Sequence, residues 1–277
     1  MSSPEKLVPL PKTSSPINSA GSPITLQYVR DITAAGLASL FVSPFIAIVD
    51  RSIIENANGK LDLVSGLKQG FKHFSTRPHQ FIRSKQFGLI YGLYFATYAT
   101  ANTIDTTYNY WNSDPQWPKF VGTTAVNMTL CIAKDRAFTR MFGIVAPRPL
   151  PIPSYALFAV RDSLTVAASF NAPSITSKEL QTYGYSRETA DVIAQLFCPA
   201  IIQFASTPLH LLGLDLYNRP DATSGKRLTL IGREYLKSVF ARIGRIGPAF
   251  GIGGVGNLYF RRVLGDCLPN KKLAVAD

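Results

Sequence analysis

The sequence predicts an all-α membrane protein, with six transmembrane helices in three pseudo-symmetric pairs around a central cavity. Three observations favour this fold class. Only 17% of the 277 residues are charged, against roughly 25% in soluble domains. Apolar residues make up 46% of the chain and gather in runs with few charges. The mean hydropathy of +0.10 is low for helices buried wholly in lipid, and fits helices that turn a polar face toward water.

The charges and cysteines exclude several classes of function. The net charge is +12, but the basic residues lie between apolar runs, as they do at the flanks of membrane helices. A nucleic-acid-binding protein would gather them in one patch. The three cysteines lack the spacing of a zinc site, and no catalytic or nucleotide-binding motif occurs. We therefore expect no enzymatic activity, no cofactor, no metal and no nucleic-acid partner.

The chain begins with a segment, residues 1–27, that is rich in proline and serine and is expected to be a flexible tail. The apolar runs that follow are 32–49, 86–104, 120–133, 155–175, 192–214 and 246–260. Several are shorter than the roughly 20 residues of a lone spanning helix, but their small residues let helices pack closely in lipid. The alternative is a soluble bundle of core helices. It is disfavoured because charge is scarce over whole stretches rather than on one helix face.

Two series of residues recur at nearly equal spacing and predict an internal repeat. In the first, an apolar run passes a proline or threonine and ends at an acid. Its members are Pro44 and Asp50, Thr129 and Asp135, and Pro208 and Asp215. In the second, an arginine stands at the entry of the next run, and its members are Arg83, Arg161 and Arg245. Both periods are close to 80 residues, which predicts repeats at 28–110, 111–185 and 186–265, followed by a tail at 266–277.

Three helix pairs of this size, with proline near the end of the odd helices, resemble the mitochondrial carrier family. Locally the match is strongest at Phe-Ala-Ser-Thr-Pro, residues 204–208. Of the charged residues in the family signature only Lys134 is in place, and the other acids and bases lie about one turn further along. The resemblance implies a monomeric, multi-pass protein of the mitochondrial inner membrane, with the outer membrane as the alternative. It also implies that the arginines of the second series are substrate contact points.

An adjacent cation and anion, Arg161 and Asp162, stand in the middle of an apolar stretch. Charge inside a membrane is costly, so this pair should face a partner or a water-filled cavity. There the guanidinium can hold a carboxylate by two hydrogen bonds while the acid holds the other end of a zwitterion. Together with Arg83 and Arg245, the pair predicts a site for a small anionic or zwitterionic substrate. The alternatives are a helix start at Arg161 and flanking charges at the other two arginines.

The charged residues at the ends of the odd runs are predicted to form a gate of ion pairs that opens and closes one side of the cavity. Exposed ion pairs contribute only about 0–1 kcal/mol each and can therefore exchange readily. The members are Asp50, Arg51, Lys134, Asp135, Arg136 and Asp215. Pro44 and Pro208 are expected to kink their helices, because proline removes a helix hydrogen bond. The alternative is a set of solvated helix ends.

Residues 63–74 and 228–240 are predicted to form amphipathic helices at the membrane surface. Basic helix entries beside them suit anionic lipid headgroups, cardiolipin among them. The leading hypothesis is a mitochondrial transporter that moves a small carboxylate-bearing metabolite, such as an amino acid or keto acid, by alternating access. The alternative is a transport-inactive relative that serves as a scaffold, receptor or insertion factor of a mitochondrial membrane.

Overall fold

The structure of the chain, a computed structural model, describes residues 22–145, 149–170 and 172–267. All the regular structure in these ranges is helical, which confirms the predicted all-α class. Most of the predicted N-terminal tail lies outside the described residues, as does most of the short C-terminal tail. The first helix already begins at Ile24, a few residues before the predicted start of the first repeat.

The described residues of each predicted apolar run lie mostly in helical structure, and residue 171 of the run at 155–175 lies outside the described residues. The first half of the chain forms α1 (Ile24–Ala57), α2 (Leu63–Thr76), α3 (Pro78–Ile82), α4 (Lys85–Tyr110) and α5 (Gln116–Phe142). The second half forms α6 (Ile152–Phe170), α7 (Ala172–Thr182), α8 (Arg187–Asn218), α9 (Ser224–Gly244), the π-helix η1 (Pro248–Val255) and α10 (Gly256–Asp266). The predicted amphipathic segments fall in α2 and α9, while the run at 155–175 is divided between α6 and α7.

Several helices begin where a side chain satisfies the free backbone N–H groups of the first turn. Asp62 accepts a hydrogen bond from the backbone nitrogen of Val64 at the start of α2. Ser84 plays the same part for α4 and Ser186 for α8. Such caps stabilise a helix by typically about 1 kcal/mol. They fix where the long helices α4 and α8 start, and therefore which of their residues face the interior.

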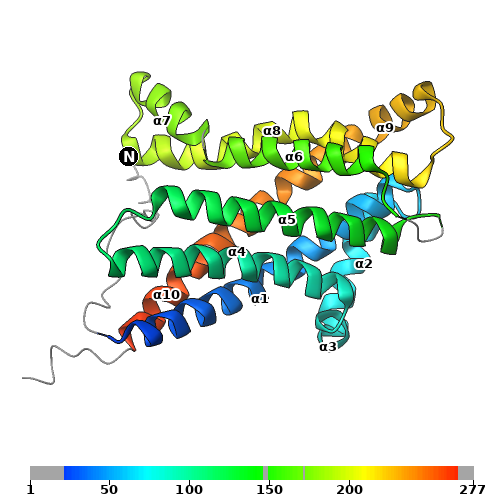
Figure 1. Ribbon diagram of the computed structural model, residues 1–277. Coiled ribbons are helices and arrows are strands. Elements are labelled where there is room, and N and C mark those ends of the chain that lie inside the picture. Colours follow the sequence, from blue (N-terminus) through cyan, green and yellow to red (C-terminus); the bar gives the residue numbers. More distant parts are fainter. Residues whose placement is uncertain (1–21, 146–148, 171, 268–277) are drawn as a thin grey trace, which may run out of the picture.

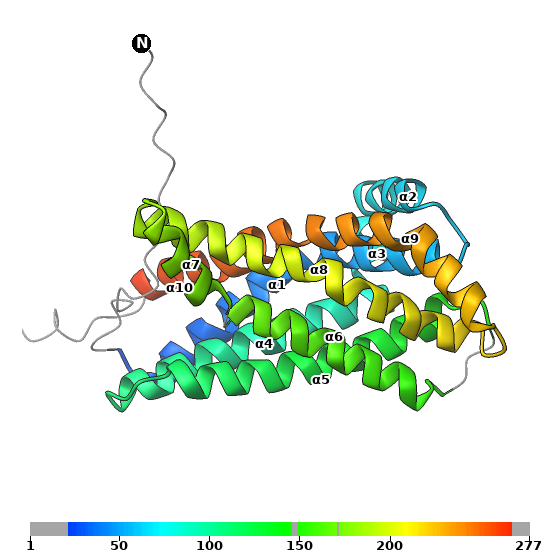
Figure 2. The same ribbon diagram turned by 90° about the horizontal axis from the view of Figure 1, so that it is seen from above.

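The long helices pack in an order that closes on itself. Helix α1 packs on α4, α4 on α5, α5 on α6, α6 on α8 and α8 on α9, and the segment from α9 through η1 to α10 returns to α1. Figure 1 shows α5 between α4 and α6, with the segment from α9 to α10 crossing them obliquely. Helix α7 turns back along α8, and α2 lies outside the ring against α1 (Figure 2). The ring surrounds an interior to which every one of these long helices contributes.

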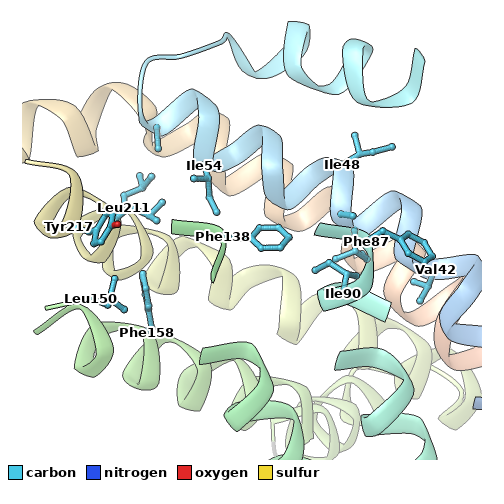
Figure 3. Close-up of a cluster of buried hydrophobic side chains, with 14 of the residues drawn as sticks. Val42, Ile48, Ile54, Phe87, Ile90, Phe138, Leu150, Phe158, Leu211 and Tyr217 are labelled. Atoms are coloured by element: carbon cyan, nitrogen blue, oxygen red, sulfur yellow. The ribbon is translucent and has the colours of Figure 1, made fainter. Parts of the chain in front are cut away.

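A buried apolar cluster joins α1, α4, α5, α6 and α8. In Figure 3, Phe138 of α5 lies between a group that includes Phe158 and Leu211 and a group that includes Phe87 and Ile90. Phe138 of α5 and Phe158 of α6 are fully buried. Because interiors are packed like molecular crystals, such side chains leave little freedom to the helices around them. The cluster therefore holds the helices that carry the polar interior in fixed positions.

Two of the described helices are long and apolar enough to cross a membrane. They are α1, with a mean hydropathy of 2.1, and residues 189–218 of α8, with 1.5. The 34 residues of α1 extend over roughly 50 Å, which exceeds the hydrocarbon core of about 30 Å. Helices α4 and α5 have 26 and 27 residues but carry more polar side chains. The membrane class is thus supported, whereas six crossings and a threefold repeat stay predictions.

The two prolines expected to kink helices both lie inside continuous helices, Pro44 in α1 and Pro208 in α8. A further proline, Pro199, also lies inside α8. Each removes one hydrogen bond from its helix. The kinks themselves stay a prediction. Helix α8 contains two prolines that interrupt its hydrogen bonding, of which only Pro208 was named from the sequence.

Candidate functional site

A cavity of about 130 Å³ lies inside the ring of helices. Helices α1, α4, α5, α6, α8 and α9 all contribute side chains to its wall. The charged and titratable lining residues are Asp50, Tyr94, Cys131, Lys134, Asp135, Arg161, Asp162, His210, Arg242 and Arg245. Three lining residues, Ile46, Ile54 and Ile90, also belong to the apolar cluster, so the packed core positions the polar wall directly.

Asp50 of α1 links three helices at this cavity. Its Oδ2 accepts a hydrogen bond from the Nζ of Lys134 on α5 at 2.7 Å. Its Oδ1 accepts one from Nη1 of Arg245, which follows α9, at 2.5 Å. The same Nζ of Lys134 lies 2.8 Å from Oδ1 of Asp135. Asp50, Lys134 and Asp135 are all buried, and buried charges persist where each has an opposite charge beside it.

Arg161 of α6 continues this network toward α5 and α8. It donates to Oδ2 of Asp135 and, from Nε and Nη2, to Oδ1 of Asp162 at 3.0 and 2.6 Å. Its Nη1 lies 2.7 Å from Nδ1 of His210. The guanidinium also stands over the ring of Phe158, 5.1 Å from the centroid. Every nitrogen of the Arg161 guanidinium thus has a partner within the protein.

The residues predicted as substrate site and those predicted as gate lie largely in one network. Arg161, Asp162 and Arg245, predicted to bind substrate, line the same cavity as Asp50, Lys134 and Asp135, predicted to form the gate. The lining residues among the predictions are Asp50, Lys134, Asp135, Arg161, Asp162 and Arg245. The predicted substrate site and the predicted gate are joined, because Asp50 pairs directly with Arg245 and Asp135 pairs with Arg161.

Four predicted residues lie away from the cavity. Arg51 and Arg136 each follow a lining acid by one residue, and a step of one residue turns the side chain about 100° around the helix. Arg51 therefore pairs with Glu55 at 2.9 Å, and Arg136 is exposed. Arg83 precedes the cap of α4, so it is exposed at the helix entry.

Asp215, the fourth of these residues, lies more than one turn beyond His210 on α8. It is buried and paired with Arg219 and with Nη1 of Arg227, the latter at 2.5 Å. It therefore ties the end of α8 to the start of α9 instead of lining the cavity.

Arg242 is a lining residue that the sequence analysis missed. Its side chain is 3% exposed, and its Nε donates to Oε1 of Gln203 at 2.9 Å. Its Nη2 donates to Oγ of Ser206 at 3.2 Å. Within the described residues no carboxylate lies within ion-pair distance of it. The available signal was its spacing from Arg245, because residues three apart share one face of a helix.

The charges on the cavity wall nearly cancel. Three acids line it, namely Asp50, Asp135 and Asp162, against the four bases Lys134, Arg161, Arg242 and Arg245. The predicted substrate site of Arg83, Arg161, Asp162 and Arg245 holds three bases and one acid, since Asp50 and Asp135 were assigned to a separate gate. The excess is therefore a single cation. Such a wall suits a ligand that carries both signs of charge.

A second buried polar network joins α1, α4 and α10 near the other end of α1. Asp31 accepts hydrogen bonds from Arg30 at 2.8 Å and Arg261 at 2.9 Å, and from Thr106. Asn102 and Asn257 exchange hydrogen bonds at 2.9 and 2.8 Å. Asp31 precedes Asp50 by 19 residues on α1, which is a rise of roughly 28 Å. The sequence analysis did not single out any of these residues.

No metal site accompanies these networks in the parts of the chain that the structure describes, since no group of three or more metal-ligating side chains gathers there. The polar side chains that line the cavity make ion pairs and hydrogen bonds. Groups of this kind bind, orient and release a charged small molecule without changing its covalent bonds.

Comparison with known proteins assigns the chain to a family. The family described as probable citrulline exporter matches residues 34–265, from α1 to the end of α10, and no curated protein matches the chain. This match overturns the resemblance to the mitochondrial carrier family, of whose signature acids and bases the chain has only Lys134 at the expected position. An exporter family is not an enzyme family, which confirms that expectation. The chain belongs to the family of probable citrulline exporters.

Proposed function

We propose that the chain exports citrulline, or a closely related neutral-side-chain amino acid, across a membrane through the central cavity. The observation that carries the proposal is a buried cavity whose wall holds three acids and four bases. Citrulline has an ammonium and a carboxylate on its α-carbon and an uncharged ureido group at the end of its side chain. The family description names the same compound. A wall with both signs of charge and a small volume fits such a ligand.

The ion pairs of the wall supply a means of binding and release. Buried charges are expensive inside a membrane and are usually found on ligand or ion pathways. A zwitterion that enters the cavity offers a carboxylate to the bases and an ammonium to the acids. Each of its charged groups can then take the place of one partner in an ion pair of the wall. The exchange costs little because the number of opposite-charge contacts is maintained. Binding can therefore loosen the links between α1, α5 and α9 that Asp50 and Lys134 make.

The two buried networks support transport by alternating access. Asp31 and Asp50 are separated by roughly 28 Å along α1, and the hydrocarbon core of a membrane is about 30 Å thick. The networks around these acids would then lie near opposite faces of the membrane. Opening one network while the other stays closed gives the cavity access to one side at a time. In this account α1, α4, α5, α6, α8 and the segment from α9 to α10 make the six crossings, grouped as the three predicted repeats.

The predicted location is the mitochondrial inner membrane, with the outer membrane as the alternative. Two long apolar helices support a membrane location, but the organelle rested on the carrier resemblance and needs its own test. Fractionation of tagged cells, followed by protease protection with and without outer-membrane rupture, distinguishes the two membranes. We expect a monomer, because one chain encloses the cavity, and anionic lipids such as cardiolipin beside α2 and α9.

Thermal stabilisation of the purified protein tests whether citrulline is a ligand. A ligand that binds only the folded state raises the melting temperature, so citrulline should raise it and an equal concentration of urea should not. Arg242→Gln, which removes a cavity cation that has no acid beside it, should weaken or abolish the shift. Arg136→Gln is the control, because it removes an exposed cation. If neither citrulline nor any other amino acid stabilises the wild type, the transport-inactive scaffold takes the place of the exporter.

A further inference from the structure

Three of the four cavity bases are already occupied by acids. Lys134 pairs with Asp50 and Asp135, Arg245 pairs with Asp50, and Arg161 pairs with Asp135 and Asp162. Arg161 is the predicted contact for a substrate carboxylate. Four of the five N–H groups of its guanidinium are already bonded to Asp135, Asp162 and His210, which leaves one N–H of Nη1. Arg161 therefore cannot hold a carboxylate by two hydrogen bonds, and the first contact of a substrate carboxylate is expected at a cation with no acid beside it.

Arg242 is the one base of the cavity wall that has no carboxylate within ion-pair distance among the described residues. It uses Nε and Nη2 on the neutral acceptors Gln203 and Ser206, while its Nη1 has no hydrogen-bond partner among the residues that the structure describes. These two acceptors also hold the guanidinium in one orientation. A buried guanidinium fixed by neutral groups keeps its full charge for an incoming anion, and the attraction is stronger than it would be in water.

Asp162 supplies a complementary free group at the same cavity. Its Oδ1 accepts both hydrogen bonds from Arg161. Its Oδ2 is buried and has no hydrogen-bond partner in the described structure. A buried carboxylate oxygen without a donor is costly, and such atoms in native proteins often mark the place of a missing ligand. Asp162 lines the same cavity as Arg242.

We propose that Arg242 binds the carboxylate of the transported amino acid and that Oδ2 of Asp162 accepts a hydrogen bond from its α-ammonium group. This assignment rests on the proposed function. The neutral lining residues Tyr94, Asn127 and Thr165 then remain for the ureido group. Because the wall already has one cation in excess, a second positive charge on the substrate side chain is repelled. The site therefore selects citrulline over ornithine, which differs by carrying an ammonium in place of the ureido group.

Affinities of three compounds for the purified full-length protein test the assignment. Citrulline has both charged groups, its carboxamide lacks the carboxylate, and 5-ureidopentanoate lacks the ammonium. Wild-type protein should bind citrulline about tenfold or more tightly than either analogue, because each loses a charge-assisted hydrogen bond. Arg242→Gln should bind citrulline and its carboxamide about equally while still disfavouring 5-ureidopentanoate. Asp162→Asn should show the reverse pattern.

Ratios within one variant do not depend on the fraction of folded protein, so a partly unstable variant still gives an answer. Arg242→Lys, which keeps the charge, serves if Arg242→Gln fails to fold, and it should retain a reduced preference for citrulline over the carboxamide. Arg140→Gln, an exposed change on α5, should keep the wild-type pattern. The assignment is overturned if Arg242→Gln and Asp162→Asn both keep the wild-type preferences. If the wild type binds none of the compounds, the proposed function fails and the assignment falls with it.

Discussion

Arg161 is the residue on which the buried charges of the cavity depend most. Its guanidinium contacts Asp135, Asp162 and His210 at once. Removing one partner of a buried ion pair leaves an uncompensated charge, which is strongly destabilising. The residue therefore acts first in holding α5, α6 and α8 together. This differs from the expectation of a hydrated cavity wall, in which its loss would affect only transport.

Arg161→Ala is accordingly expected to lower the free energy of unfolding by about 3–5 kcal/mol. The measurement is denaturant unfolding of the purified protein in detergent, followed by circular dichroism. Arg51→Ala is the control, since its pair with Glu55 is a partly exposed contact within one helix and is worth about 0–1 kcal/mol. Equal losses in the two variants would contradict a structural role for the Arg161 network.

At this scale the sequence could identify charges but not their partners. Arg161 and Asp162 were recognised because they interrupt an apolar stretch, and they do line the cavity. Arg242 was missed because it belongs to a helix with many other polar residues. Its burial depends on Gln203 and Ser206, which lie more than thirty residues earlier in the chain. Contacts of that range are decided by helix packing and leave no local pattern.

Close helix contacts depend on glycines that have no room for a side chain. At Gly213 of α8, an added Cβ would lie 2.5 Å from Cε1 of Phe158 on α6. At Gly253 of η1, it would lie 2.2 Å from the hydroxyl of Tyr98 on α4. Small residues at such points let helices approach closely in lipid, where packing replaces the hydrophobic effect as the driving force. Within the apolar Gly-Ile-Gly-Gly at 251–254, Gly253 is therefore a packing residue, whereas nothing lies within 4 Å of an added Cβ at Gly254.

Gly213→Ala should lower the free energy of unfolding by about 1–3 kcal/mol, because overpacking forces Phe158 out of its place in the buried cluster. Gly92→Ala is the matched control, since nothing lies within 4 Å of its added Cβ. Both changes bring the same gain of up to about 1 kcal/mol in helix propensity. The difference in thermal unfolding between the two variants isolates the clash. A Gly213 variant as stable as the control would refute the close contact of α6 and α8.

The helices could be predicted from the sequence where an apolar run is uninterrupted. The prediction was poorer where one helix gives way to another or where an α-helix changes to a π-helix. The run at 155–175 was expected to form one helix, but the structure divides it between α6 and α7. Pro173 accounts for the second start, because proline is favoured in the first turn of a helix. The final run contains the π-helix η1 before α10, and neither hydropathy nor spacing indicates that geometry.

For the molecule as a whole, the all-α class and six of the residues that line the cavity could be predicted from the sequence, whereas the family could not. Prolines and a period near 80 residues suggested mitochondrial carriers, yet these features describe helix pairs in general. The acids and bases that would have been specific, such as an acid two residues after Pro44, were not in place, since Ile46 stands there. The second network around Asp31 was also missed. Its members come from α1, α4 and α10, which meet only when the ring closes.

Alternating access requires the network around Asp31 to close one end of the pathway. Asp31→Asn would leave Arg30 and Arg261 without their shared carboxylate and should favour opening at that end. Cys131, which lines the cavity, then reports access. The test uses a background in which Cys198 and Cys267 are changed to serine. In the Asp31 variant, the rate at which a membrane-impermeant maleimide labels Cys131 should rise about tenfold. A tenfold rise corresponds to a shift of about 1.4 kcal/mol toward the open state. Asp221→Asn, an exposed change, should label like the background, and an unchanged rate in the Asp31 variant would argue against a gate there.

Efflux of radiolabelled citrulline from liposomes that contain the purified protein tests the central claim most directly. The account predicts saturable efflux of citrulline that ornithine competes with poorly, because the cavity wall already carries one excess cation. It also predicts that efflux is strongly reduced in Arg242→Gln and kept in Arg136→Gln. Efflux no faster than from protein-free liposomes, for citrulline and for every other amino acid in the panel, would contradict the claim that this chain is a transporter.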